Sequence, residues 1–190
     1  MNFAKFSGSH FDFWVFRSNA KKVLREPRNF FGKLESKGKI EPAFGYFVDL
    51  LIVSSILSIV GVLLFQPIII KFLSENFNIP TQNPSYTLQA FLIAFVESVV
   101  GGALLSFLWS GILHLWIRLF KGNGDFAKSY ELYVYTRTPI LLTGWIPLVG
   151  LVGWFYSIYL MMIGVQKLHG ISKKRSILMI ILALYLNFRF

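Results

Sequence analysis

The chain of 190 residues contains no cysteine, and only nine acidic residues stand beside nineteen Lys and Arg. The absence of cysteine excludes a disulfide framework, a thiolate metal site and a thiol nucleophile. The first thirty residues also lack a continuous apolar core before a small-residue cleavage site, so we expect no removable signal peptide. The first long hydrophobic segment is therefore expected to direct membrane insertion itself.

Hydrophobic residues, by contrast, make up 55% of the chain, and the mean hydropathy is +0.58. Apolar runs of about 20 residues, the length that crosses about 30 Å of hydrocarbon as a helix, recur along the sequence. The predicted fold class is all-α, a polytopic transmembrane helical bundle of about five spans. The spans are expected at residues 46–70, 87–120, 131–145, 148–166 and 176–188, of which the third and fifth are short for a full crossing.

The distribution of basic residues predicts the orientation, because Lys and Arg near span ends are retained on the cytoplasmic side. Nine of the nineteen lie in residues 1–45, and seven more follow the second and fourth segments, whereas the opposite side receives only Lys71 and Arg189. We therefore expect a cytoplasmic amino terminus and an external carboxyl terminus. The net charge of +10 is expected to meet anionic lipid headgroups of the bilayer rather than nucleic acid.

Residues 1–45 are predicted to form a basic, aromatic cytoplasmic segment, and residues 46–190 the transmembrane domain. Pro27 can occupy the first turn of a short amphipathic helix. That helix would place Phe30 and Phe31 in the headgroup region of the bilayer and keep Lys33 in water. The alternative is that the segment packs on the cytoplasmic loops of the bundle.

Three ionisable residues fall near the cytoplasmic ends of predicted spans: Asp49, His114 and Arg137. Charge in hydrocarbon is costly, so such residues normally face a partner or a water-filled cavity. We expect an Asp49–Arg137 ion pair with His114 nearby, which either locks the first and third helices or forms a polar site open to the cytoplasm. Glu97 lies in the outer half of the second span as an isolated intramembrane acid.

Small residues recur at four-residue spacing on several predicted spans. Such faces let helices approach closely, either within one chain or between the copies of a homo-oligomer, and a serine face can also line a polar pathway. The positions expected at helix contacts are Ser54, Ser58, Ser98, Gly102, Ser106, Ser110, Gly153 and Ser157.

The sequence shows no catalytic or metal-binding constellation. The stretch GNGD at residues 122–125 matches the short motif of intramembrane aspartyl proteases, but no second aspartate with the expected motif lies in a neighbouring span. A glycine-rich turn between helices explains the stretch better. His114 and Glu97 lie at depths too different to share an ion, so we expect no metal, no cofactor and no enzymatic activity.

Several stretches together resemble the Yip family of multispan membrane proteins. They are VLREPRNFF (residues 23–31), PAFGYF (42–47), KGNGDFAKSYELYVYTRTPILL (121–142), GWIPLVG (144–150) and WFYSIYLMMIGVQKLHGISKKRSI (154–177). The resemblance covers roughly residues 23–186 and is most specific over 133–147 and 159–172. It implies five helices with a cytoplasmic amino terminus and an external or lumenal carboxyl terminus.

The resemblance also implies a role and a location. Eukaryotic Yip proteins reside in Golgi and endoplasmic reticulum membranes, bind Rab-type GTPases and take part in vesicle traffic, generally with a longer cytoplasmic region. This chain is more similar to the compact bacterial or archaeal members. The expected location is the plasma membrane for a prokaryotic source, and the Golgi or endoplasmic reticulum for a eukaryotic one.

We therefore expect a non-enzymatic membrane protein that organises membranes by recruiting lipid or protein partners through its basic, aromatic cytoplasmic face. The expected protein partner is a second copy of the chain or a cytoplasmic protein. The alternative is a small transporter or channel that uses Glu97 and the serine face as a polar route. That alternative requires a continuous water-accessible cavity that reaches Glu97.

Overall fold

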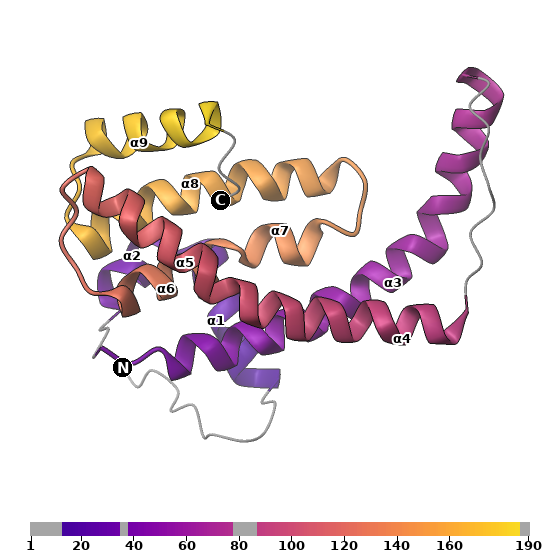
Figure 1. Cartoon of the computed structure of the whole chain (residues 1–190), viewed down its shortest axis with the longest axis horizontal. Coiled ribbons are helices and arrows are strands. Elements are labelled where there is room, and N and C mark those ends of the chain that lie inside the picture. Colours follow the sequence, from indigo (N-terminus) through magenta and orange to yellow (C-terminus); the bar gives the residue numbers. More distant parts are fainter. Residues whose placement is uncertain (1–12, 35–37, 78–86, 187–190) are drawn as a thin grey trace.

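A computed structural model describes residues 13–34, 38–77 and 87–186. No strand occurs in these three ranges, and the predicted all-α helical bundle is confirmed. The elements are α1 (Phe13–Arg25), α2 (Pro27–Lys33), α3 (Glu41–Phe77), α4 (Leu88–Val96), the π-helix η1 (Glu97–Gly101), α5 (Gly102–Leu119), α6 (Phe126–Thr136), α7 (Thr138–Thr143), α8 (Val149–His169) and α9 (Lys173–Tyr185). In Figure 1, α4, η1 and α5 form one long rod. Helix α8 lies between α7 on one side and α9 on the other.

Three stretches of the described chain are long and apolar enough to cross a membrane: Glu41–Phe77, Leu88–Leu119 and Val149–His169. They contain most or all of the predicted first, second and fourth spans. The predicted fifth span corresponds to α9, which has 13 residues, and its last residues, 187 and 188, lie outside the described ranges. At about 1.5 Å per residue, α9 is about 20 Å long and shorter than the hydrocarbon layer.

The predicted third span, residues 131–145, is not one continuous helix. α6 ends at Thr136 and α7 begins at Thr138, with Arg137 at the junction. Pro139 explains the break, because it has no N–H to offer the carbonyl of Tyr135 and its ring clashes with that preceding turn. The predicted third segment therefore consists of two short helices that meet at Arg137.

The amino-terminal helices α1 and α2 belong to the bundle and pack against α8, α7 and α3. Phe30 and Phe31 are only 5% and 1% exposed, and the ring of Phe31 lies against the backbone of Gly164 in α8. The prediction that these two rings lie in the headgroup region is therefore wrong, because they fill the protein core, while Lys33 is exposed as expected. α3 begins at Glu41, so the predicted domain boundary at residue 45 falls inside a helix.

The buried core occupies only one half of the molecule. It is formed by α1, α2, the first half of α3, the second half of α5, α6, α8 and α9. The second half of α3 and α4 project away from this core (Figure 1), and their apolar side chains are largely exposed. A soluble monomer rarely exposes so large an apolar surface, whereas a bilayer would cover it.

Candidate functional site

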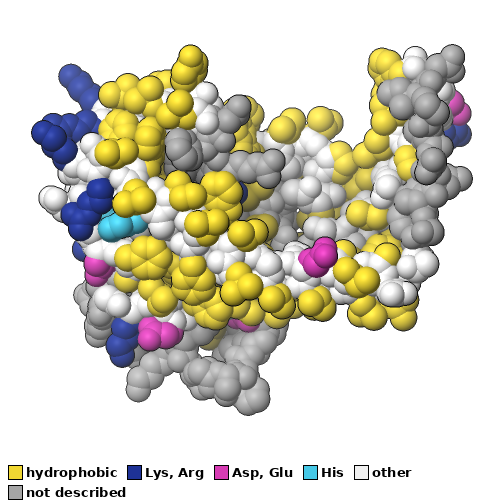
Figure 2. Space-filling view, in the orientation of Figure 1, with side chains coloured by type: hydrophobic (Ala, Val, Ile, Leu, Met, Phe, Trp, Pro, Cys, Tyr) yellow, Lys and Arg dark blue, Asp and Glu magenta, His cyan; other side chains and the backbone are white. Residues whose placement is uncertain are grey.

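Basic side chains gather at one end of the molecule, where α5 and α8 end and α9 begins (Figure 2). We call this region the basic end. Its exposed members in this part of the chain are Arg118, Lys121, Lys167, Lys173, Lys174 and Arg175. Beyond its basic first turn, α9 exposes apolar side chains that include Ile177, Leu178 and Ile181. Positive charge therefore lies directly beside an apolar, bilayer-compatible surface.

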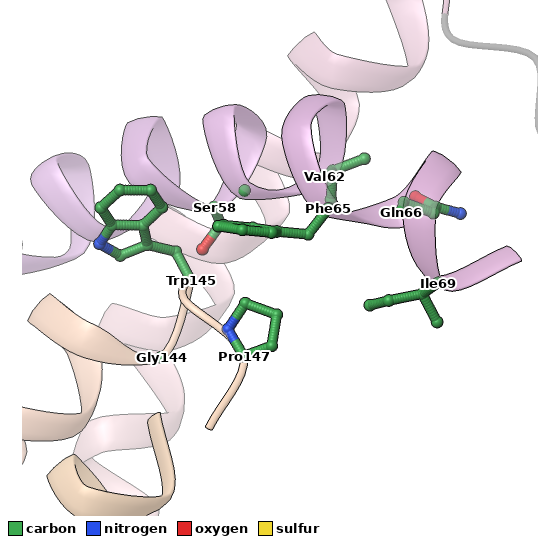
Figure 3. Close-up of a pocket in the computed structure, with 9 residues that line it drawn as sticks. Ser58, Val62, Phe65, Gln66, Ile69, Gly144, Trp145 and Pro147 are labelled. Atoms are coloured by element: carbon green, nitrogen blue, oxygen red, sulfur yellow. The ribbon is translucent and has the colours of Figure 1, made fainter. Parts of the chain in front are cut away.

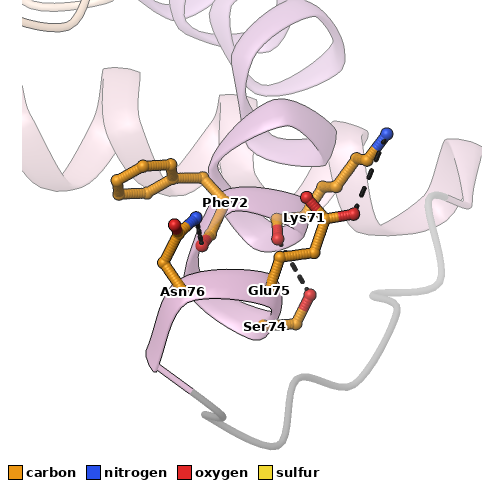
Figure 4. A network of polar contacts seen from close by, with 5 residues as sticks. All are labelled: Lys71, Phe72, Ser74, Glu75 and Asn76. Atoms are coloured by element: carbon orange, nitrogen blue, oxygen red, sulfur yellow. Dashed lines mark hydrogen bonds and ion pairs between the residues drawn. The ribbon is translucent and has the colours of Figure 1, made fainter.

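The far end of α3 is balanced in charge instead. Lys71 lies 3.9 Å from the carboxylate of Glu75 one turn later, and both side chains are exposed (Figure 4). Ser74 donates a hydrogen bond to the carbonyl of Lys71, and Asn76 donates one to the carbonyl of Phe72. The two ends of the apolar helices thus differ in net charge.

At the basic end, a chain of hydrogen bonds joins the consecutive helices α5 and α6 to α8. His114 Nδ1 of α5 lies 2.8 Å from Ser129 Oγ of α6, and the same hydroxyl lies 3.4 Å from His169 Nε2 of α8. Ser129 is fully buried and His169 is 1% exposed, whereas His114 is half-buried. We call these three residues the His–Ser–His chain.

The glycine-rich loop between α5 and α6 encloses the inner end of this chain. His169 Nδ1 lies 3.0 Å from the carbonyl oxygen of Asn123, and the N–H of Asn123 donates to the carbonyl of His169 at 2.9 Å. A Cβ atom on Gly124, whose φ is 139°, would lie only 2.8 Å from His169 Nδ1. Asp125 then caps α6 by accepting a hydrogen bond from the N–H of Lys128. Residues 122–125 are thus a turn that holds His169.

The His–Ser–His chain is not a nucleophilic site as it stands. A serine paired with histidine is the arrangement of a hydrolase nucleophile, but that hydroxyl must reach its substrate. Ser129 is fully buried and both of its neighbours in the chain are imidazoles. Over residues 13–34, 38–77 and 87–186, no group of three His, Asp or Glu side chains is arranged to hold a metal ion.

The predicted ion pair of Asp49 and Arg137 is not formed in the structure. Arg137 lies at the α6–α7 junction, where its guanidinium carbon is 5.0 Å from the centre of the Tyr133 ring. Asp49 remains half-buried on α3, and His114 is held by Ser129. The predicted polar cluster of Asp49, His114 and Arg137 is therefore wrong.

Glu97 begins the π-helix η1 and is exposed on an otherwise apolar rod. An open groove of about 290 Å³ lies between α3 and the turn after α7 (Figure 3). In Figure 3, Gln66 and Ile69 stand on one side of the groove and Trp145 and Pro147 on the other. Its lining is mainly apolar and does not include Glu97, so this groove does not supply the polar route that a transporter would need.

The small residues singled out from the sequence mostly lie at contacts within the chain. The hydroxyl of Ser98 accepts a hydrogen bond from Ser55 of α3, and the hydroxyl of Ser106 is hydrogen-bonded to that of Tyr130. Gly102 lies close to the side chain of Leu51. Gly153 lies against Thr143 and Pro139, whereas Ser54, Ser110 and Ser157 are buried and Ser58 is exposed at the groove.

Sequence reasoning did not bring Ser129 or His169 into the site. The available signal was the resemblance itself, because AKSY and LHGIS lie in two of the stretches that carry it. Neither stretch shows a metal-ligand or catalytic spacing. The contact between them depends on how α6 packs beside α8.

Comparison with known proteins places the chain in a family. The Yip1 domain family matches residues 21–188, which include all of α2 to α9. Neither the curated proteins nor the solved structures yield a match. The matched region covers most of the 190 residues and contains three apolar helices long enough to span a bilayer. The chain therefore belongs to the Yip1 domain family and is a membrane protein.

Proposed function

We propose that this Yip-family protein organises membranes, in a non-catalytic, trafficking-type role, by holding anionic lipid headgroups at its basic end. One observation carries the proposal: the exposed cations gather beside the apolar surface of α9, whereas Lys71 at the far end of α3 is paired with Glu75. A basic residue close to an anionic membrane surface contributes about 1 kcal/mol to binding. Together, the three residues Lys173, Lys174 and Arg175 should therefore contribute about 3 kcal/mol to the binding of an anionic membrane surface.

The same charge distribution supports a cytoplasmic basic end. Retention of Lys and Arg on the cytoplasmic side would orient α8 with its end at His169 inward. The absence of native cysteine makes the test direct, since a single introduced thiol is the only one present. In intact cells, Lys71→Cys should react with a membrane-impermeant maleimide, whereas Lys174→Cys should react only after permeabilisation. Labelling with the opposite pattern would contradict this orientation.

The lipid preference is tested with the full chain in vesicles that contain phosphatidylcholine and phosphatidylserine. The protein is extracted with its surrounding lipid in polymer nanodiscs, and the serine lipid that accompanies it is quantified by mass spectrometry. Enrichment is expected for the unmodified chain and should fall at high salt, because exposed charges are screened. The double variant Lys174→Gln with Arg175→Gln should lose much of the enrichment.

Lys71→Gln is the matched control for this experiment. It removes one cation from the far end of α3, where Glu75 already balances the charge. If Lys71→Gln reduces the enrichment as much as the double variant does, the basic end is not the lipid site. Enrichment that persists in both variants and at high salt would overturn the electrostatic explanation altogether.

A further inference from the structure

The rod formed by α4, η1 and α5 is the least covered of the long apolar stretches. Only 6% of the residues in its most apolar 18-residue stretch are buried, against 33% for α3 and 39% for α8. α3 packs against one side of η1, yet no residue of α4 or η1 is fully buried. A bilayer can cover the apolar side chains of this rod, so their exposure alone requires no protein partner.

Glu97 is different, because hydrocarbon does not satisfy a carboxyl group. Its side chain is exposed, and its carboxyl group forms no ion pair or hydrogen bond with residues 13–34, 38–77 or 87–186. The rod continues past Glu97 as α4, which is mostly apolar and exposed and about 14 Å long. Since α4 also needs hydrocarbon around it, Glu97 stands within the bilayer, where acidic side chains normally pair with one another or face a cavity.

A glycine without an internal role lies one turn from Glu97. A Cβ atom at Gly101 would meet nothing within 4 Å, whereas one at Gly102 would lie 3.0 Å from the side chain of Leu51. Packing within the chain therefore explains Gly102 but not Gly101. A glycine on the surface of a membrane helix lets the backbone of a second helix approach closely. Glu97 and Gly101 also begin and end the π-helix η1, and such distortions frequently mark functional sites.

We propose that two copies of this chain associate through this face of the rod, with Gly101 at the close approach and the carboxyl group of Glu97 hydrogen-bonded to its counterpart. Two copies inserted in the same direction are related by a two-fold axis along the membrane normal, which brings residues near the axis against their own counterparts at equal depth. A second copy therefore necessarily carries a polar group at the depth of Glu97. A carboxyl group with its proton both donates and accepts, so it can satisfy a second carboxyl group.

The same geometry predicts where the two rods separate. Membrane helices that meet at small residues commonly cross at about 40°. Gly111 lies about 15 Å further along the rod, so the two rods should have diverged by about 10 Å at that point. A Cβ atom at Gly111 would also meet nothing within 4 Å of it in its own chain. Gly111 is therefore the matched control, an equally open glycine outside the proposed contact.

Association is measured with the full chain in vesicles of phosphatidylcholine alone, so that no anionic lipid is involved. Because the chain has no native cysteine, Lys71→Cys can be labelled with a donor or an acceptor dye, and energy transfer is followed as the protein-to-lipid ratio rises. Glu97→Leu should raise the ratio at half-association about 3- to 30-fold, the range expected for interhelical hydrogen bonds in membranes. Glu97→Gln should associate about as tightly as the parent chain, because an amide both donates and accepts.

The glycine variants locate the contact. Gly101→Leu should weaken association and Gly111→Leu should not, and neither change meets a clash at Cβ within one copy. Without dye labels, Gly101→Cys should become covalently dimeric on oxidation, whereas Gly111→Cys should stay monomeric, because a disulfide needs Cα atoms within about 7 Å.

Three results would overturn the proposal. The first is a parent chain that stays monomeric at every protein-to-lipid ratio, which would leave Glu97 for a different partner, such as a membrane helix that carries a cation. The second is a Glu97→Leu variant that associates as tightly as the parent chain. The third is identical behaviour of the Gly101 and Gly111 variants.

Discussion

Replacement of Gly61 by alanine tests how closely α3 approaches the turn after α7. A Cβ atom at Gly61 would lie 2.6 Å from the backbone oxygen of Trp145 and 3.2 Å from its Cβ. Backbone cannot move aside as a side-chain tip can, so overpacking should cost about 1–3 kcal/mol. Alanine recovers about 1 kcal/mol of helix propensity over glycine. We therefore expect Gly61→Ala to lower the free energy of unfolding by about 0–2 kcal/mol.

Gly111 of α5 is the matched control, because a Cβ atom there would meet nothing within 4 Å. Gly111→Ala should retain the propensity gain of about 1 kcal/mol without the overpacking cost. The two variants should therefore differ by about 1–3 kcal/mol, the overpacking cost alone. The measurement is unfolding by SDS in mixed micelles, followed by tryptophan fluorescence. If Gly61→Ala proves as stable as Gly111→Ala, the close approach of α3 to Trp145 does not exist in the membrane.

Three further predictions use the same unfolding measurement. Phe31→Ala should cost about 3–5 kcal/mol because it empties a core position, whereas Phe13→Ala, at a ring that is 54% exposed, should change stability by less than about 0.5 kcal/mol. Asp125→Ala should lower the free energy of unfolding by about 1 kcal/mol because it removes the cap of α6, whereas Asp125→Asn should keep most of the stabilisation that the cap provides. A double-mutant cycle of Asp49→Asn with Arg137→Gln should give a coupling below about 0.5 kcal/mol, and a larger value would restore the ion pair.

The third predicted span shows what hydrophobic length leaves out. The span was drawn over residues 131–145 from their apolar character, and Pro139 lies inside it. The structure breaks the helix between Thr136 and Thr138, because a proline removes a backbone donor and crowds the preceding turn. Hydrophobic length alone therefore overstates the continuity of a helix that contains proline.

Phe30 and Phe31 show a different limit. Aromatic rings beside Arg28 and Lys33 suit a membrane interface, but the same pattern suits a helix packed on a protein core with its charges in water. A membrane interface and the edge of a protein core each place an apolar region next to water, so the residue pattern does not distinguish between them. The contact of Phe31 with Gly164 of α8, far along the chain, decides for the core.

The sequence by itself determined the all-α membrane class, three of the apolar helices and the gathering of positive charge, since hydrophobic length and flanking charge are properties of local segments. Counting residues along a span also yields depth in the membrane. Depth is only one coordinate, however, and the position of a side chain around the bundle depends on which helices pack together. Asp49 and Arg137 were expected at similar depths but do not pair, whereas His114 reaches His169 through Ser129. Only the tertiary structure decided those partners, because helix packing sets which faces meet.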